Sequence, residues 1–428
     1  MLNIRNFSNI LIIIISISFG IKFYYLSNGN VLNFYPLISP DGFDWYTEGA
    51  YLYNHILHES LLPLNVLRPP FFVILTSLDY MLGERGLILA LSYSLSFVVT
   101  YFSIIWIIEN KNKNKNKNKN AWYLIAVLIA VTFHPINFHK AYLLADSIGV
   151  SLSLLSIVFF ISFQNYKNYK YFFSAFIFAL MGGLTQTYAA IPFIIFVSIY
   201  ILYNLLTIKK DIFFPTLYLL IFIATYLIII ISWRDFIPHS VTPKNFTLLK
   251  FNLNMTTFYL NVWLYYFAPF ILFVVLAKNQ ITFIKKIDRV NLSLFFIILS
   301  VALLCFFYQW TDARFSYILW PWAIIFFFKT VKPKNNRKGF ILILILFLLS
   351  SSLVPGSFWG PRVFDLSLNA KKNWFVEYMT MNHTNRKFET CRSHNCENSF
   401  IENSDNYVKG TMSKYFYLKH DLKANTKD

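Results

Sequence analysis

The stretch ILALSYSLSFVVTYFSIIWII, residues 88–108, decides the fold. It carries no charged side chain, and it is long enough to cross a bilayer as a helix, which takes about 20 mostly apolar residues. A Lys-Asn repeat follows at residues 111–120. Because that repeat has nothing apolar to bury, we expect a disordered loop there. We therefore expect residues 88–120 to form a membrane-crossing helix followed by a basic loop.

The same kind of composition extends through the whole chain. Of its 428 residues, 57% are hydrophobic and only 14% are charged, whereas an ordinary soluble domain is about 25% charged. A water-soluble protein of this length cannot hide so much apolar surface. The composition argues against a soluble enzyme, a nucleic-acid-binding protein and a disordered scaffold, and it indicates a multi-pass membrane protein.

Stretches like residues 88–108 recur along the chain, and about eleven are candidates for spanning helices. They cover residues 10–27, 88–108, 121–134, 146–163, 171–186, 189–207, 213–233, 261–277, 290–308, 315–329 and 339–356. The expected fold class is an all-α polytopic membrane protein. Residues 1–356 form its transmembrane domain, and residues 357–428 form a short polar tail.

The loops between these segments alternate in charge, which predicts the orientation. One set holds roughly 17 basic residues and the other roughly 7, and the positive-inside rule places the richer set in the cytoplasm. The N-terminus is then cytoplasmic, and helix parity puts the C-terminal tail outside. The formal charge of +18 is spread over short clusters between apolar runs, so it does not predict a nucleic-acid partner.

Polar and aromatic residues gather in the outer loops. The largest is residues 29–87, and the others are residues 134–146, 233–259 and 308–314. Charges near membrane depth are costly and usually face a cavity. If these segments converge, they form a polar pocket at the outer membrane surface, where a lipid-borne headgroup can bind.

Two carboxylates, Asp41 and Asp44, stand three residues apart in the first outer loop, beside Trp45 and Tyr46. A carboxylate within hydrogen-bond reach of an acceptor hydroxyl can act as a general base. The structural alternative is that Asp41 makes a turn after Pro40 and Asp44 caps a following helix. The spacing leaves both open.

Arg68 and Arg314 are candidates for phosphate binding, because an arginine presents its donors as a fixed fork. Arg68 precedes two prolines that can start a helix. An apolar stripe at helical spacing follows and suits a helix lying along the interface; it consists of Phe71, Ile74, Leu75 and Leu78. The alternatives are that Arg68 extends to lipid headgroups and that Arg314 pairs with Asp312.

His134, His139 and Lys140 crowd the outer end of one span, and Asp146 stands at the start of the next. His and Asp are good metal ligands, so a divalent metal ion is compatible with this stretch, although none is required. The simpler alternative for Asp146 is a helix N-cap.

In this order, the motifs resemble those of membrane glycosyltransferases with the GT-C fold. The nearer resemblance is to the branch that contains the protein O-mannosyltransferases and the lipid A aminoarabinose transferase. The matching stretches span most of residues 1–330. They are Asp41-Gly42-Phe43-Asp44-Trp45-Tyr46 with Ala50, Arg68-Pro69-Pro70 to Gly83, His134-Pro135 with Asp146-Ser147, Gly182-Gly183-Leu184-Thr185, and Asp312-Ala313-Arg314-Phe315 with Pro321.

The resemblance implies transfer of a sugar from a polyprenyl-phosphate-linked donor to a glycan, lipid or protein acceptor. The reaction would take place on the outer face of the cytoplasmic (inner) membrane. Asp41 matches the catalytic carboxylate, with Asp44 as the second choice. The other expected pocket residues, including those for the donor phosphate, are Arg68, Arg314, Lys140, Asp146, His134, His139 and Tyr46.

Two departures from the family pattern stand out. Gly42 follows Asp41 where the family often has Asp-Glu, and Gln186, Thr187 and Tyr188 stand where many relatives carry Lys or Arg.

A flippase for lipid-linked saccharides or a secondary transporter is the alternative function. A transporter should show internal repeats and broken helices at mid-membrane, whereas here the polar residues gather at one face. A polysaccharide polymerase or ligase would favour a large outer loop late in the chain, but here the large loop comes first.

Overall fold

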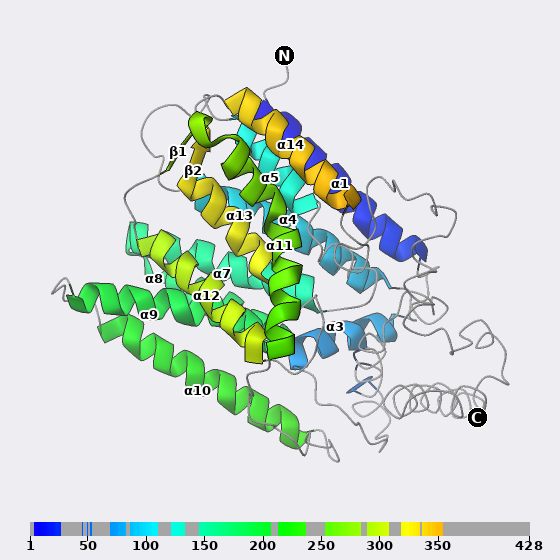
Figure 1. Cartoon of the computed structure of the whole chain (residues 1–428). Helices are drawn as coiled ribbons and strands as arrows, with labels where there is room; N and C mark the ends of the chain where they lie inside the picture. The colour runs from blue at the N-terminus through cyan, green and yellow to red at the C-terminus, as the bar shows by residue number, and fades with distance from the viewer. Residues whose placement is uncertain are drawn as a thin grey trace.

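A computed structural model of the chain is shown in Figure 1. It describes residues 4–26, 45, 49, 52–53, 69–82, 86–109, 121–132, 145–206, 213–236, 253–283, 289–307, 318–333 and 336–353. Statements about structure below concern these residues.

Each predicted apolar segment coincides with a helix, so the helical class is confirmed. The helices are α1 (Ile4–Leu26), α4 (Leu87–Glu109), α5 (Ala121–Thr132), α7 (Asp146–Tyr166), α8 (Tyr169–Thr185), α9 (Ile191–Leu206), α10 (Phe213–Phe236), α11 (Leu253–Leu276), α12 (Arg289–Phe307), α13 (Leu319–Thr330) and α14 (Asn336–Leu353). A short 3-10 helix, η4 (Thr187–Ala190), precedes α9, and η5 (Lys278–Gln280) follows α11.

Four of the described helical segments are long and apolar enough to cross a membrane by length and composition. They are Leu87–Glu109, Asp146–Tyr166, Thr187–Leu206 and Phe213–Trp233. The larger number of spans expected from the sequence therefore stays a prediction.

Helix α3 (Pro70–Met81) begins at the Pro-Pro pair, as predicted, with Pro at its first positions. Its buried face carries Phe72, Val73, Thr76 and Asp79. Ile74 and Leu78, from the predicted apolar stripe, are exposed on the other face, whereas Phe71 and Leu75 are half-buried. An outward apolar face suits a helix lying against lipid.

One short pair of strands lies among the helices and was not expected from the sequence. Strand β1 (Ile281–Phe283) pairs antiparallel with β2 (Val331–Pro333), with Ile281 opposite Pro333. A three-residue strand has too few alternating positions to be recognised in a sequence. The pairing joins the segment after α11 to the segment after α13.

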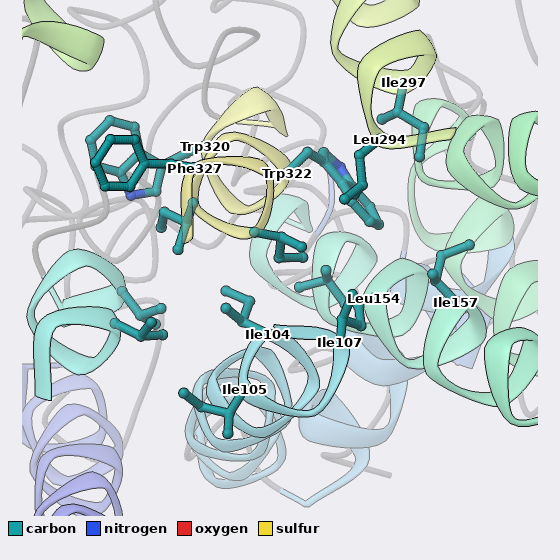
Figure 2. Close-up of a cluster of buried hydrophobic side chains, with 14 of the residues drawn as sticks. Ile104, Ile105, Ile107, Leu154, Ile157, Leu294, Ile297, Trp320, Trp322 and Phe327 are labelled. Atoms are coloured by element: carbon teal, nitrogen blue, oxygen red, sulfur yellow. The ribbon is translucent and has the colours of Figure 1, made fainter. Parts of the chain in front are cut away.

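The hydrophobic core lies around α4, which contacts α1, α3, α5, α7 and α13. Figure 2 shows Ile104 and Ile107 of α4 near Leu154 of α7, with Trp322 of α13 and Leu294 of α12 completing the cluster. All five side chains are almost fully buried. Large and branched apolar side chains from four helices thus fill the centre of the bundle.

Another side chain of α13 fixes the opposite side of that helix. Trp320 donates its indole N–H to the carbonyl oxygen of Ala130 in α5, at 3.1 Å. Its ring lies 5.5 Å from that of Phe270 in α11 and 6.0 Å from that of Phe347 in α14. A buried indole needs such an acceptor, so Trp320 sets how α13 sits against α5.

Buried side chains of opposite charge hold the two ends of α4. Asp79 of α3 accepts hydrogen bonds from the backbone N–H groups of Gly86 and Ile88, both at 2.9 Å. At the other end, the Lys329 ammonium of α13 donates to the carbonyl oxygen of Ile107 at 3.3 Å. An acid at the N-terminus and a base at the C-terminus match the helix dipole, and both satisfy backbone groups that a helix leaves unpaired.

Replacing Asp79 by Ala should lower the free energy of unfolding by about 2–4 kcal/mol, because two buried N–H groups lose a charged acceptor. The measurement is the thermal unfolding midpoint of the protein in detergent. Leu78→Ala is the matched control, since Leu78 is 39% exposed, and Asp79→Asn should fall between the two. Equal midpoints for Asp79→Ala and Leu78→Ala would contradict the capping role.

Candidate functional site

Asp146 is the predicted site residue that lies within the described part of the chain. Outside it lie Asp41, Asp44, Tyr46, Arg68, His134, His139, Lys140 and Arg314. Several of their neighbours are described, namely Trp45, Gly49, Pro69 and Ala145. These neighbours show which helices the first two outer segments contact.

The first outer segment is anchored on α3. The Trp45 ring, 1% exposed, lies edge-on to Phe72 with the ring centres 4.9 Å apart. The Thr76 hydroxyl donates to the Trp45 carbonyl oxygen at 3.0 Å. At Gly49, an added Cβ would lie 2.3 Å from the Thr76 Oγ1 and 2.7 Å from the Ser77 backbone nitrogen. Trp45 and Gly49 are therefore both fixed against α3.

Asp146 is the first residue of α7, and its side chain is 5% exposed. The N-cap position is held by Ala145, whose side chain makes no capping hydrogen bond. The N-cap alternative for Asp146 is therefore wrong, because the residue lies one position inside the helix. Its carboxylate accepts a hydrogen bond from the Tyr188 hydroxyl.

Tyr188 reaches Asp146 because the end of α8 lies close to its neighbours. A Cβ at Gly183 would lie 3.0 Å from the Ala190 Cβ and 3.1 Å from the Tyr226 Cε2, and one at Gly182 would lie 3.5 Å from the Gly149 backbone oxygen. The Cβ at Gly182 would make ordinary van der Waals contact, whereas the one at Gly183 would force Ala190 or Tyr226 to shift by a few tenths of an ångström. Gly183 thus lets η4 follow directly after α8, with Tyr188 beside α7.

The sequence did not identify Tyr188 as a site residue; it stood out only as a departure from the basic residues of relatives. A tyrosine after a Gly-Gly pair is only weak evidence for a site residue, because the sequence does not indicate which carboxylate its hydroxyl binds. Asp79 was also missed. Its signal was stronger, because it is the charged residue in the apolar stretch PFFVILTSLDYM of α3, and a buried charge among apolar residues points to a specific partner.

Tyr93 brings the two buried carboxylates into one neighbourhood. It is fully buried in α4 and lies within electrostatic range of both Asp146 and Asp79. Helix α3 also contacts α8, and α4 contacts α7. Four elements therefore meet at one end of the bundle: α3, the start of α4, the start of α7, and η4.

The residues around Asp146 determine which ligand groups can bind here. Asp146 is a buried acceptor oriented by a phenol, which suits hydrogen bonds from the hydroxyl groups of a sugar. Among the described residues, no group of three or more His, Cys, Asp and Glu side chains can hold a metal ion. The expected phosphate-binding arginines, Arg68 and Arg314, lie outside the described ranges.

Comparison with known proteins gave one structural similarity. Neither a family model nor a curated protein matches the chain. The chain is similar to the crystal structure of ArnT from Cupriavidus metallidurans bound to undecaprenyl phosphate, with a TM-score of 0.46 and 11% sequence identity, over 95% of this chain and 75% of that one.

Replacing Tyr188 by Phe should lower the free energy of unfolding by about 1–3 kcal/mol, because a buried carboxylate loses a donor. A double-mutant cycle with Asp146→Asn isolates this bond. The measurement is the thermal unfolding midpoint, with Tyr169→Phe as the control, since Tyr169 is 50% exposed. If the effects of Tyr188→Phe and Asp146→Asn simply add, the two residues are not coupled and the assignment fails.

Proposed function

We propose that the chain is a membrane glycosyltransferase of the GT-C type. It transfers a sugar from a polyprenyl-phosphate-linked donor to a glycan, lipid or protein acceptor on the outer face of the cytoplasmic membrane. In this orientation the N-terminus is cytoplasmic and the first outer loop, residues 29–87, carries the catalytic carboxylate.

The observation that carries the proposal is the buried Asp146–Tyr188 pair at the start of α7. A carboxylate kept among apolar helices is costly and is usually retained for function. Helix α7, which carries Asp146, contacts α4, and the N-terminus of α4 is bound to α3 through Asp79. Helix α3 in turn holds Trp45, which lies between Asp44 and Tyr46 in the sequence. This arrangement supports a pocket between the first two outer segments.

The outward face of α3 supports a lipid-linked donor. Ile74, Leu78 and Met81 are all exposed on it, and the helix follows directly after Arg68. A polyprenyl chain can lie along this apolar face while its phosphate reaches the arginine. A water-soluble nucleotide-sugar donor would make no use of such a surface.

The proposed reaction is an inverting displacement. The acceptor hydroxyl oxygen attacks the anomeric carbon of the donor sugar, and the bond from that carbon to the phosphate oxygen breaks. Asp41, or Asp44 as the second candidate, takes the proton of the hydroxyl. The phosphate leaves with the electron pair, and Arg68 and Arg314 stabilise its growing negative charge.

The remaining pocket residues have supporting roles in this proposal. Asp146, oriented by Tyr188, accepts hydrogen bonds from the sugar hydroxyls. Lys140 adds positive charge near the donor phosphate. His134, His139 and Tyr46 line the pocket from the first two outer segments.

Asp41→Asn should reduce transfer by a factor of at least about 100, the usual contribution of a general base, without affecting membrane insertion. The assay follows labelled sugar from polyprenyl-phosphate donors into acceptors in membrane extracts containing the purified protein. Glu48→Gln is the control, since it removes a carboxylate from the same loop.

Two outcomes would contradict the proposal. Full activity of both Asp41→Asn and Asp44→Asn would remove the catalytic role of the first loop. Movement of the labelled donor across the membrane of proteoliposomes without sugar transfer would instead identify a flippase.

A further inference from the structure

Three exposed aromatic rings meet where α8 and α10 begin, at the end of α7 away from Asp146. Tyr169 is the first residue of α8, and Phe213 is the first residue of α10. The ring centre of Phe214 lies 5.6 Å from that of Tyr169 and 5.6 Å from that of Phe213. All three side chains are at least half exposed. We call Tyr169, Phe213 and Phe214 the aromatic patch; it has no part in the sugar transfer proposed above.

Helices α8 and α10 run side by side away from the aromatic patch. One turn beyond it, the ring centre of Phe172 lies 4.5 Å from that of Tyr218. One turn further, Phe176 lies edge-on to Phe222, with the ring centres 5.6 Å apart. Because the contacts advance by about one turn on both helices at each step, the two helices are parallel and leave the patch in the same direction.

The outward faces of both helices continue the exposed apolar surface of the patch. Side chains four residues apart lie on the same face of a helix. The exposed side chains at this spacing are Tyr169, Phe173 and Ile177 on α8, and Phe213, Leu217 and Ile221 on α10. Residues Phe213–Trp233 are one of the segments long and apolar enough to cross a membrane. Acyl chains can therefore cover these two faces.

The turn before α8 has the opposite character. Residues 165–170, with the sequence NYKNYK, are all exposed. The Asn168 side chain accepts a hydrogen bond from the Lys170 backbone N–H at 3.0 Å and so begins α8. Among acyl chains, the Lys170 ammonium and the Asn168 amide would lose their water, which is costly. In water, the exposed rings next to them would stay hydrated, which is unfavourable.

The boundary between headgroups and acyl chains satisfies both requirements. Tyrosine is enriched at this depth, because its ring is apolar and its hydroxyl is polar. A basic side chain at the same level can reach the headgroups.

We propose that the aromatic patch is a membrane-interface surface that inserts at the boundary between the headgroups and the acyl chains of one leaflet. Its rings contact the acyl chains, and the Lys170 ammonium reaches the headgroups. Helices α8 and α10 enter the bilayer together from this level. Helix α7 has 21 residues and is about 30 Å long, which is the thickness of the hydrocarbon core. Asp146 then lies at the boundary of the opposite leaflet.

The test measures the depth of nitroxide spin labels in the full-length protein, and it does not depend on sugar transfer. Cys305, Cys391 and Cys396 are replaced by Ser, and one new cysteine at a time is introduced and labelled. The protein is placed in vesicles of phosphatidylcholine and phosphatidylglycerol. Depth follows from the collision rates of the label with oxygen, which concentrates among acyl chains, and with a water-soluble nickel chelate.

The labelled series on α8 is Tyr169→Cys, Phe173→Cys and Ile177→Cys. The label at residue 169 should lie at the boundary, and each later label should lie deeper by up to about 6 Å, the rise of four helical residues. Phe213→Cys, Leu217→Cys and Ile221→Cys should give the same profile on α10. Leu95→Cys is the control for the acyl region, since Leu95 is exposed within the apolar helix α4.

Three outcomes would overturn the proposal. Free collision of the label at residue 169 with the nickel chelate would place the patch in water. Low collision rates with both reagents would show that a protein surface, such as a second copy of this chain, covers the patch. Equal depth along each series would show that α8 and α10 do not enter the bilayer from this level. If the α8 variants fail to fold, the α10 series decides.

Discussion

The backbone N–H and C=O groups at the ends of a helix need hydrogen-bond partners when the helix ends among apolar neighbours. In α4, charged side chains of other helices provide these partners. Asp79 satisfies N–H groups at its start, and Lys329 satisfies a carbonyl near its end. Because unpaired backbone groups are costly away from water, these contacts fix where α3 and α13 lie along α4. Both ends of the central helix are thus set by residues from other parts of the chain.

The candidate site depends on this arrangement. Helix α3 cannot slide along α4 without breaking the bonds of Asp79, and α3 holds Trp45 and Gly49 of the first outer segment. Helix α7 lies against α4 and carries Asp146 at its start. The same central helix therefore positions both the first-loop segment and the buried carboxylate, although they are about 100 residues apart in the chain.

The helices could be predicted from the sequence because a bilayer leaves few other structures for long apolar runs. Their ends were less predictable: α11 begins at Leu253, several residues before the apolar run, in a stretch that mixes polar and aromatic residues. The two short strands carry no usable periodicity. Asp146 could be singled out in the sequence from its position at the start of an apolar run, and its role in a site stays a prediction. Its bond to Tyr188 depends on how α8 packs on α7. The pairing partner of a buried group is a property of tertiary packing, which one sequence does not reveal. The first-loop carboxylates Asp41 and Asp44 lie outside the described residues and stay predictions.

The β1–β2 pair has a mechanical consequence. Its backbone hydrogen bonds join the connection from α11 to α12 with the connection from α13 to α14. Helix α12 contacts α9 and α13, while α14 contacts α5 and α11. A displacement of one connection is therefore transmitted to the other through main-chain bonds, which a substitution removes only where it introduces proline. Motions of α12 and α14 are coupled in this way although the two helices are not consecutive in the chain.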